Sequence, residues 1–180
     1  MPKNWRKLAS EPSTDFTIFS LLREQYESPR NGQQLQASIV QAPDWINVIA
    51  LTPARDCILI RQFRFGCQRV TIEIPGGMLD AGEQPLVAAK RELREETGYS
   101  AEHWTPLGRV APNPAFQRNH LYMFLAEDCR LEGAQIQDPG EDIEVTLTPL
   151  SEIRRLIADE EIDHALVLVT FLKAQQYLSF

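Results

Sequence analysis

Residues 76–100, GGMLDAGEQPLVAAKRELREETGYS, restrict the fold most, because they combine a helix signal with a high density of carboxylates. Pro85 suits the first turn of a helix, where its missing N–H costs nothing. Gly98 suits the left-handed position that ends a helix. Most residues from 86 to 97 favour helices. The sequence therefore predicts a helix over 86–97 whose first turn begins at Pro85.

The predicted helix has an acidic face. At about 100° per residue, Glu92, Glu95 and Glu96 fall within one sector, and the adjacent sector is apolar. Like charges at these spacings repel by roughly 0.2–0.5 kcal/mol per pair, and by more where water is excluded, so a cation is expected there. Carboxylate oxygens without His or Cys nearby in sequence favour magnesium or manganese over zinc. The apolar sector, expected to enter the core, comprises Leu86, Ala89 and Leu93.

Arg91 lies among these carboxylates in sequence and is expected to act structurally. Its guanidinium can pair with Glu83 or with a neighbouring carboxylate and so hold the preceding loop on the helix. A run such as KRELREE is, by itself, more often a plain solvated helix face. The spacing of the whole stretch decides between these interpretations.

That spacing resembles the signature of the Nudix hydrolases. The matching positions are Gly77, five residues, Glu83, seven residues, Arg91-Glu92-Leu93, one residue, Glu95-Glu96, one residue, and Gly98-Tyr99. The resemblance implies a loop–helix–loop that binds a divalent metal and hydrolyses a nucleoside diphosphate linked to another group. The metal, Mg²⁺ with Mn²⁺ as a substitute, would neutralise pyrophosphate oxygens and align the attacking water.

The same resemblance assigns roles to individual residues. Glu92 and Glu96 are the implied principal metal ligands, and the backbone carbonyl of Gly76 is a further ligand. Glu95 is placed beside them, both as a ligand and in catalysis.

Segments outside the signature resemble the ADP-ribose pyrophosphatase and nucleoside diphosphate sugar hydrolase branch of this family. That branch implies a catalytic base on the loop before the last of these segments, which corresponds best to Glu141. Glu144 is the second candidate, and Asp142 is close to both. The segments are QAPDWINVIALT, LIRQFRFG, TIEIPGG, NPAF and EDIEVTLTPL.

The branch also implies substrate contacts. Arg64 matches its phosphate-contacting arginine, whereas Arg61 points to the opposite face of a regular strand. Pro114 stands close to the branch's marker proline, although Pro112 competes with it. Trp45 is a candidate for stacking on the base, but a large aromatic beside an apolar strand more often packs. Weaker candidates for base recognition are Phe19 and Arg30.

The chain divides into two parts by pattern. Residues 1–41 read as hairpin-like strands without the apolar mass to stand alone, so an antiparallel β layer that forms a homodimer is expected. Residues 42–180 are the expected Nudix hydrolase domain. Their irregular alternation of strands and helices favours an α+β fold, an α/β/α sandwich around a mixed sheet.

Composition narrows the function classes. The formal net charge of −7 argues against nucleic acids and anionic membranes as partners. Three cysteines without CxxC spacing argue against disulfides and zinc, and a reducing cytoplasm fits best. No run is apolar and long enough to cross a bilayer.

The expected activity is cleavage of the pyrophosphate of ADP-ribose or a nucleotide sugar into a nucleoside monophosphate and a sugar phosphate. One alternative is a dinucleoside polyphosphate or nucleotide hydrolase that uses the same helix. Another is a Nudix-fold sensor that binds a nucleotide sugar without cleaving it.

Overall fold

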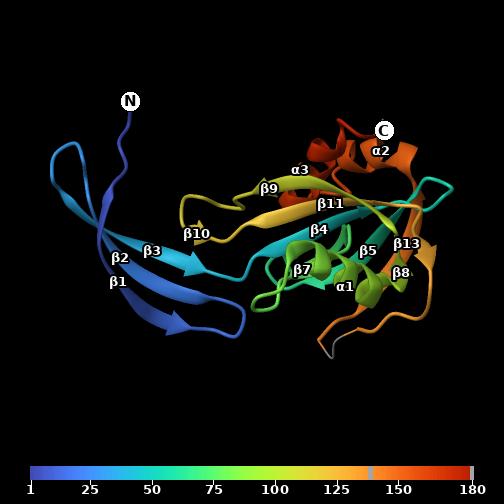
Figure 1. The fold of residues 1–180 in the computed structure, drawn as a ribbon, viewed down its shortest axis with the longest axis horizontal. Helices are drawn as coiled ribbons and strands as arrows, with labels where there is room; N and C mark the ends of the chain where they lie inside the picture. The colour runs from blue at the N-terminus through green and yellow to red at the C-terminus, as the bar shows by residue number, and fades with distance from the viewer. Residues whose placement is uncertain (138–139, 179–180) are drawn as a thin grey trace. The chain divides into compact units, whose positions relative to one another are not determined.

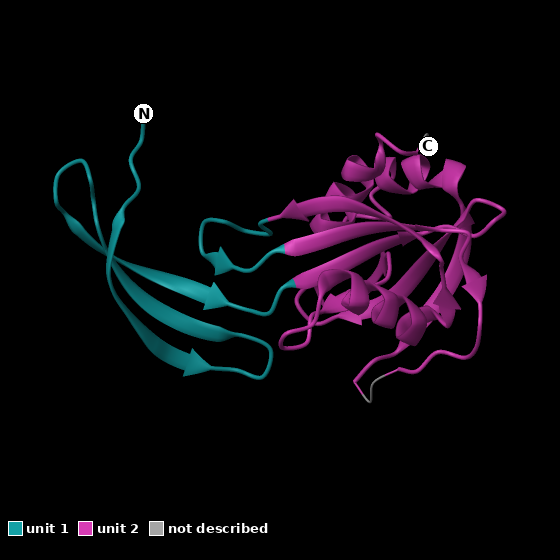
Figure 2. Ribbon diagram, in the orientation of Figure 1, with its two compact units in different colours: residues 1–44, 111–120 teal, residues 45–110, 121–180 magenta. Residues whose placement is uncertain are grey.

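The computed structural model describes residues 1–137 and 140–178 and forms two compact units (Figures 1 and 2). The first unit comprises Met1–Asp44 together with Ala111–His120. The second comprises Trp45–Val110 and Leu121–Phe180. Sequence reasoning did not anticipate that residues 111–120, which lie between two strands of the second unit, join the first.

The first unit is a four-stranded sheet in the order β1-β2-β3-β10. The first three strands are antiparallel, as expected for the N-terminal layer, and β10 runs parallel to β3. Across residues 1–44 and 111–120, the buried side chains are Glu24, Ser28 and Asn119, all of them polar. The unit therefore has no apolar core of its own. Its strands are β1 (Arg6–Asp15), β2 (Ser20–Glu27), β3 (Gln34–Gln41) and β10 (Gln117–Arg118).

The described strands of the second unit form three sheets. The largest has the order β7-β4-β11-β9, and it is mixed because β4 and β11 run parallel while the other pairs are antiparallel. The second has the order β13-β5-β6, and the third pairs β12 with β8. The bounds are β4 (Trp45–Ala50), β5 (Asp56–Arg64), β6 (Arg69–Glu73), β7 (Gly76–Met78), β8 (Tyr99–Ser100), β9 (His103–Val110), β11 (Leu121–Glu127), β12 (Arg130–Leu131) and β13 (Ile143–Pro149).

Helices cover two faces of these strands (Figure 1). Because side chains alternate along a strand, Ile49 of β4 packs into the cluster with α2 and α3, whereas Val48 packs into the cluster with α1. This confirms the predicted α+β fold with helices on both sides of a mixed sheet. The helices are α1 (Pro85–Thr97), α2 (Ile153–Ala158) and α3 (Ala165–Ala174), with a 3-10 turn, η1 (Leu150–Glu152), ahead of α2. No helix among the described residues is long and apolar enough to span a membrane.

Helix α1 matches the sequence prediction at both ends. Pro85 is its first residue, and Gly98 adopts φ +77° directly after it. The apolar face is partly different from the expected one: Leu86 is 39% exposed, so its assignment to the core was wrong. Ala89 and Leu93 are buried as expected, and Ala88 is buried as well, because small side chains let the helix lie close to the sheet.

We expect Gly98→Ala to destabilise the second unit more than Gly82→Ala does. Both glycines have positive φ, which an L residue adopts at a cost of roughly 1 kcal/mol. A Cβ at Gly98 would also lie 2.2 Å from the carbonyl oxygen of Gly133, whereas a Cβ at Gly82 meets nothing within 4 Å. Urea unfolding of both variants separates the two effects. Equal losses of unfolding free energy in the two variants would show that the backbone at Gly133 moves away from the new Cβ at little cost.

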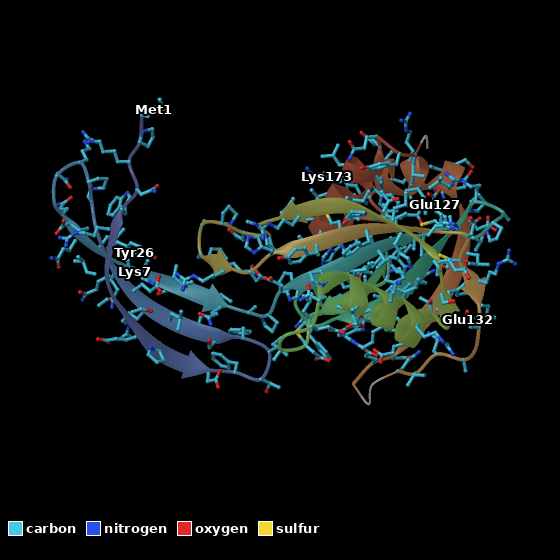
Figure 3. The ribbon with its side chains drawn as sticks, viewed as in Figure 1. Met1, Lys7, Tyr26, Glu127, Glu132 and Lys173 are labelled. Carbon is cyan, nitrogen blue, oxygen red and sulfur yellow. The ribbon has the colours of Figure 1, made fainter. Side chains whose placement is uncertain are left out.

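Glu24 of β2 is a buried carboxylate that side chains from β1, β2 and β10 contact. Its carboxylate is fully buried and accepts two hydrogen bonds from Arg118 of β10, at 3.1 and 2.7 Å. Ser10 and Tyr26 donate to it at 2.9 and 2.6 Å. Lys7 of β1 is the register partner of Tyr26 (both labelled in Figure 3), and it forms an ion pair with Glu24. The guanidinium holds the pKa of Glu24 well below its usual range, since burial, which raises it, is outweighed by these donors.

The stabilisation by Glu24 should therefore depend on pH. Because its folded pKa lies below the unfolded value near about 4.3, the ion pair contributes in full above that pH and is lost as pH falls toward the folded pKa. We expect Glu24→Gln to speed amide exchange of β1 and β2 strongly at neutral pH, and the difference from the wild type to shrink progressively as pH falls below about 4. Glu27→Gln is the control, since its partner Arg6 is 69% exposed and such pairs contribute little. A pH-independent difference would contradict this account.

Candidate metal and catalytic site

The acidic face of α1 lies against Gly76 and Gly77 at the start of β7. The N–H of Gly76 donates to Oε2 of Glu96 at 2.9 Å. A Cβ at Gly77 would lie 2.2 Å from Oε1 of Glu92. Gly77 thus lets the backbone lie closer to the Glu92 carboxylate than a larger residue would, whereas a Cβ at Gly76 would meet Asn47 and the carbonyl of Ile46. The structure brings together Gly76, Glu92 and Glu96, three of the residues predicted to bind the metal. Metal binding by the carbonyl of Gly76 stays a prediction.

Glu92 and Glu96 are buried carboxylates one helical turn apart, 9% and 3% exposed. Burial raises the pKa of Glu92, and its neighbours Glu95 and Glu141 raise it further against the pull of Arg91. Burial likewise raises the pKa of Glu96 well above its usual range, despite the N–H of Gly76. Glu96 forms no ion pair with any described residue. Negative charge at this place is therefore undercompensated.

This donor set fits a hard divalent cation. Two buried carboxylates with undercompensated charge are stabilised when a cation shares their oxygens. Among the described residues, no group of three or more His, Cys, Asp or Glu side chains is already arranged around one point. In this structure Arg91 donates hydrogen bonds to Glu92 and Glu95.

Arg91 has the structural role expected for it. Its guanidinium donates to both oxygens of Glu83, at 3.1 and 3.0 Å, and to the carbonyl of Met78 at 3.1 Å. It also donates to Glu92 at 2.9 Å and to Glu95 at 3.0 Å. The pKa of Glu83 is lowered by this pairing. The arginine therefore joins the loop after β7 to the helix and orients two of the predicted ligands.

Glu95 is the least buried of the three helix carboxylates. Its side chain is 37% exposed, against 12% for that of Glu92, and Arg91 is its hydrogen-bond donor. The structure keeps it beside Glu92 and Glu96. Its proposed part in metal binding and catalysis stays a prediction.

Arg64 ends β5 on the same side of the sheet as the acidic face. It donates to both oxygens of Glu73 at 2.7 Å and contributes positive potential at Glu96. Thr71 also donates to Glu73, at 2.6 Å. Burial raises the pKa of Glu73, but these partners together lower it below its usual value. Arg61 is exposed on the opposite face, as the strand period predicts.

Glu141 lies close enough to the helix carboxylates for its charge to act on them. It raises the pKa of both Glu92 and Glu96 through its negative charge. Glu144, the second candidate, is exposed on β13, where its register partner is Arg61. These positions favour Glu141 over Glu144, and its role as a base stays a prediction.

The remaining predicted substrate contacts are Trp45 and Pro114. Trp45 begins β4, opposite Leu121 and Met78, and packs partly buried against the core cluster of α2 and α3. Pro114 belongs to the first unit, in a turn where the N–H of Gln117 donates to the carbonyl of Asn113 at 2.8 Å. Neither is placed beside the carboxylates by a described contact.

Sequence reasoning missed two features of the site. One is Glu73, whose signal was a lone acid within the β-branched run RVTIEI, opposite the strand that ends in Arg64. The other is the amide pair Gln135 and Gln137, which hydrogen bond to backbone near the helix and β13. No sequence motif marks these glutamines.

Comparison with known proteins identifies the family. The NUDIX domain model matches residues 43–171. An ADP-ribose pyrophosphatase of Bacillus subtilis (strain 168) is 34% identical over 158 residues, covering 87% of this chain and 85% of that protein. A methanol dehydrogenase activator of Bacillus methanolicus is 32% identical over 151 residues, covering 82% of each. The crystal structure of an ADP compounds hydrolase has the same fold, with a TM-score of 0.87 at 22% identity, over 99% of this chain and 96% of that one.

The chain belongs to the Nudix family, because the family model covers well over half of it. Membership confirms the resemblance drawn from the signature between Gly77 and Tyr99. The chain is accordingly a Nudix pyrophosphohydrolase.

We expect Gly77→Ala to weaken metal binding. The new Cβ would displace the carboxylate of Glu92, and such a shift typically costs about 10- to 100-fold in metal affinity. Titration with Mn²⁺ followed by electron paramagnetic resonance measures the affinity. Gly66→Ala is the control, since a Cβ there meets nothing within 4 Å. Unchanged Mn²⁺ affinity in Gly77→Ala, at unchanged thermal stability, would contradict the assignment of Glu92.

Proposed function

We propose that the chain hydrolyses ADP-ribose, or a closely related nucleoside diphosphate sugar, to a nucleoside monophosphate and a sugar phosphate. The observation that supports this chemistry is that Glu141 lies near the buried pair Glu92 and Glu96 and that its charge acts on both. The substrate class is supported by the 34% identity to an ADP-ribose pyrophosphatase over 87% of the chain.

In this proposal Mg²⁺, or Mn²⁺ in its place, is bound by Glu92 and Glu96 with Glu95 and the Gly76 carbonyl. When bound, the metal neutralises the charge that develops on the pyrophosphate oxygens. The undercompensated charge of the buried carboxylates supports this part of the proposal.

The chain's own residues supply the rest of the reaction. Glu141 takes a proton from a water molecule. As it does so, the oxygen of that water forms a bond to phosphorus and the bridging P–O bond breaks. The leaving phosphate departs with the electron pair of that bond. Arg64, held by Glu73, is proposed to contact a phosphate, and Trp45 and Pro114 are proposed to contact the nucleoside part.

Two further assignments complete the proposal. The chain is expected to form a homodimer through its first unit, because the strands there bury no apolar core. Light scattering during gel filtration would measure its mass. A reducing cytoplasm suits its three free cysteines, two of which are buried.

The proposed base is tested by Glu141→Gln. We expect kcat on ADP-ribose to fall by about 100-fold or more, with little change in KM, because general base catalysis contributes on this scale and the group acts after binding. Product analysis in Mg²⁺ should show AMP and ribose 5-phosphate from the wild type.

Glu144→Gln is the matched control, since it removes the same charge from an exposed position near Glu141 in sequence. A loss of kcat in Glu144→Gln and none in Glu141→Gln would show that Glu144 of β13 is the base instead. The wild type should also be tested on a panel of ADP-ribose, other nucleotide sugars and dinucleoside polyphosphates. If it binds a nucleotide sugar tightly but releases product from no member of the panel, the result would favour a sensor.

A further inference from the structure

A short segment, residues 132–137, runs along the C-terminal turn of α1 and is called the strap. Glu132, its first residue, is labelled in Figure 3. The N–H of Glu132 donates to the carbonyl of Gly98 at 2.9 Å, and the N–H of Ile136 donates to that of Glu95 at 2.8 Å. The last carbonyls of a helix have no partner within the helix. The strap therefore caps the turn that carries two of the helix carboxylates.

Gln135 extends this contact from the helix to β13. Its Nε2 group donates to the carbonyl of Glu96 and, at 3.1 Å, to the carbonyl of Ile143. One side-chain amide thus joins the backbone of a proposed metal ligand to the first residue of the strand. The nearby carbonyl of Ala134 accepts from Arg94 at 3.3 Å, which ties the strap to the helix a second time.

Gln137 contacts the same strand residue with both ends of its amide. Its Nε2 donates to the carbonyl of Ile143 at 2.8 Å, and its Oε1 accepts from the N–H of Ile143 at 3.1 Å. This is the pair of bonds that one residue of an antiparallel ladder makes with another. A carboxamide can make both bonds because it carries a donor and an acceptor side by side.

Building on the proposed function, we propose that Gln135 and Gln137 are positioning residues for Glu141. Glu141 stands two residues before Ile143, and its charge acts on Glu92 and Glu96. The two amides fix Ile143 to the strap and to α1. They thereby set the position of the Glu141 carboxylate relative to the helix that carries the metal ligands.

Both amides lie outside the hydrophobic clusters of the second unit. Removing them should leave the core packing unchanged while the backbone beside Glu141 gains freedom. A base displaced by about 1 Å can lose up to roughly 100-fold in rate. The effect should therefore appear in turnover rather than in global stability or substrate binding.

Gln137→Met tests this role, because methionine keeps the length of the side chain and removes both hydrogen bonds. We expect kcat on ADP-ribose to fall about 10-fold with KM nearly unchanged. The Ile143 amide should exchange faster, which is measured without substrate. Gln135→Met should show the same pattern.

The decisive comparison places Gln137→Met in a Glu141→Gln background. If Gln137 acts through Glu141, Gln137→Met has no further effect once the base is gone, so the two losses are not additive. A loss of equal size in both backgrounds would show a merely structural role and overturn the proposal. So would an unchanged kcat despite faster exchange at Ile143.

Gln176→Met is the control, since Gln176 is exposed beyond α3 and the same substitution should change neither kcat nor exchange at Ile143. Failure of the wild type to cleave ADP-ribose would count against the proposed function. In that case exchange at Ile143 still tests the amide contacts, and unchanged exchange in Gln137→Met would refute them independently.

Discussion

The burial of Glu92 and Glu96 one helical turn apart is the constraint on which the rest of the site depends. Two carboxylates removed from water repel each other and favour protonation unless positive charge is supplied. The surrounding structure supplies some of it: the N–H of Gly76 donates to one, and Arg91 donates to the other. The remaining imbalance suits a divalent cation, which is what hydrolysis of a pyrophosphate requires.

Backbone contacts rather than apolar packing hold the parts around this pair. Strand β7 and the strap each reach α1 through hydrogen bonds that use their main-chain groups, and Arg91 holds the loop after β7 by its pair with Glu83. Such bonds are directional, so they set positions more closely than apolar contacts do. The strap is the clearest case, because it caps the helix and also hydrogen bonds to Ile143, the first residue of β13.

Much of this arrangement follows from local sequence. The helix from Pro85 to Thr97, the left-handed Gly98 and the pairing of Arg91 with Glu83 were all predicted from spacing, because they depend on neighbours within about fifteen residues of one another. Leu86 was misplaced because the exposed side of a first turn is decided by how the helix meets the sheet. Gln135 and Gln137 were missed because an amide's role depends on which backbone lies opposite.

The sequence by itself determined the acidic helix, its ends, the mixed α+β fold and the family, since these rest on periodicity and on fixed spacings along the chain. Only the tertiary structure decided that Glu141 rather than Glu144 lies near the helix carboxylates, that Arg64 pairs with Glu73, and that residues 111–120 join the N-terminal strands. The first and the third depend on segments far apart in sequence, and the pair of Arg64 with Glu73 depends on how the neighbouring strands β5 and β6 align. Their approach is fixed by strand register and burial, which no local pattern records.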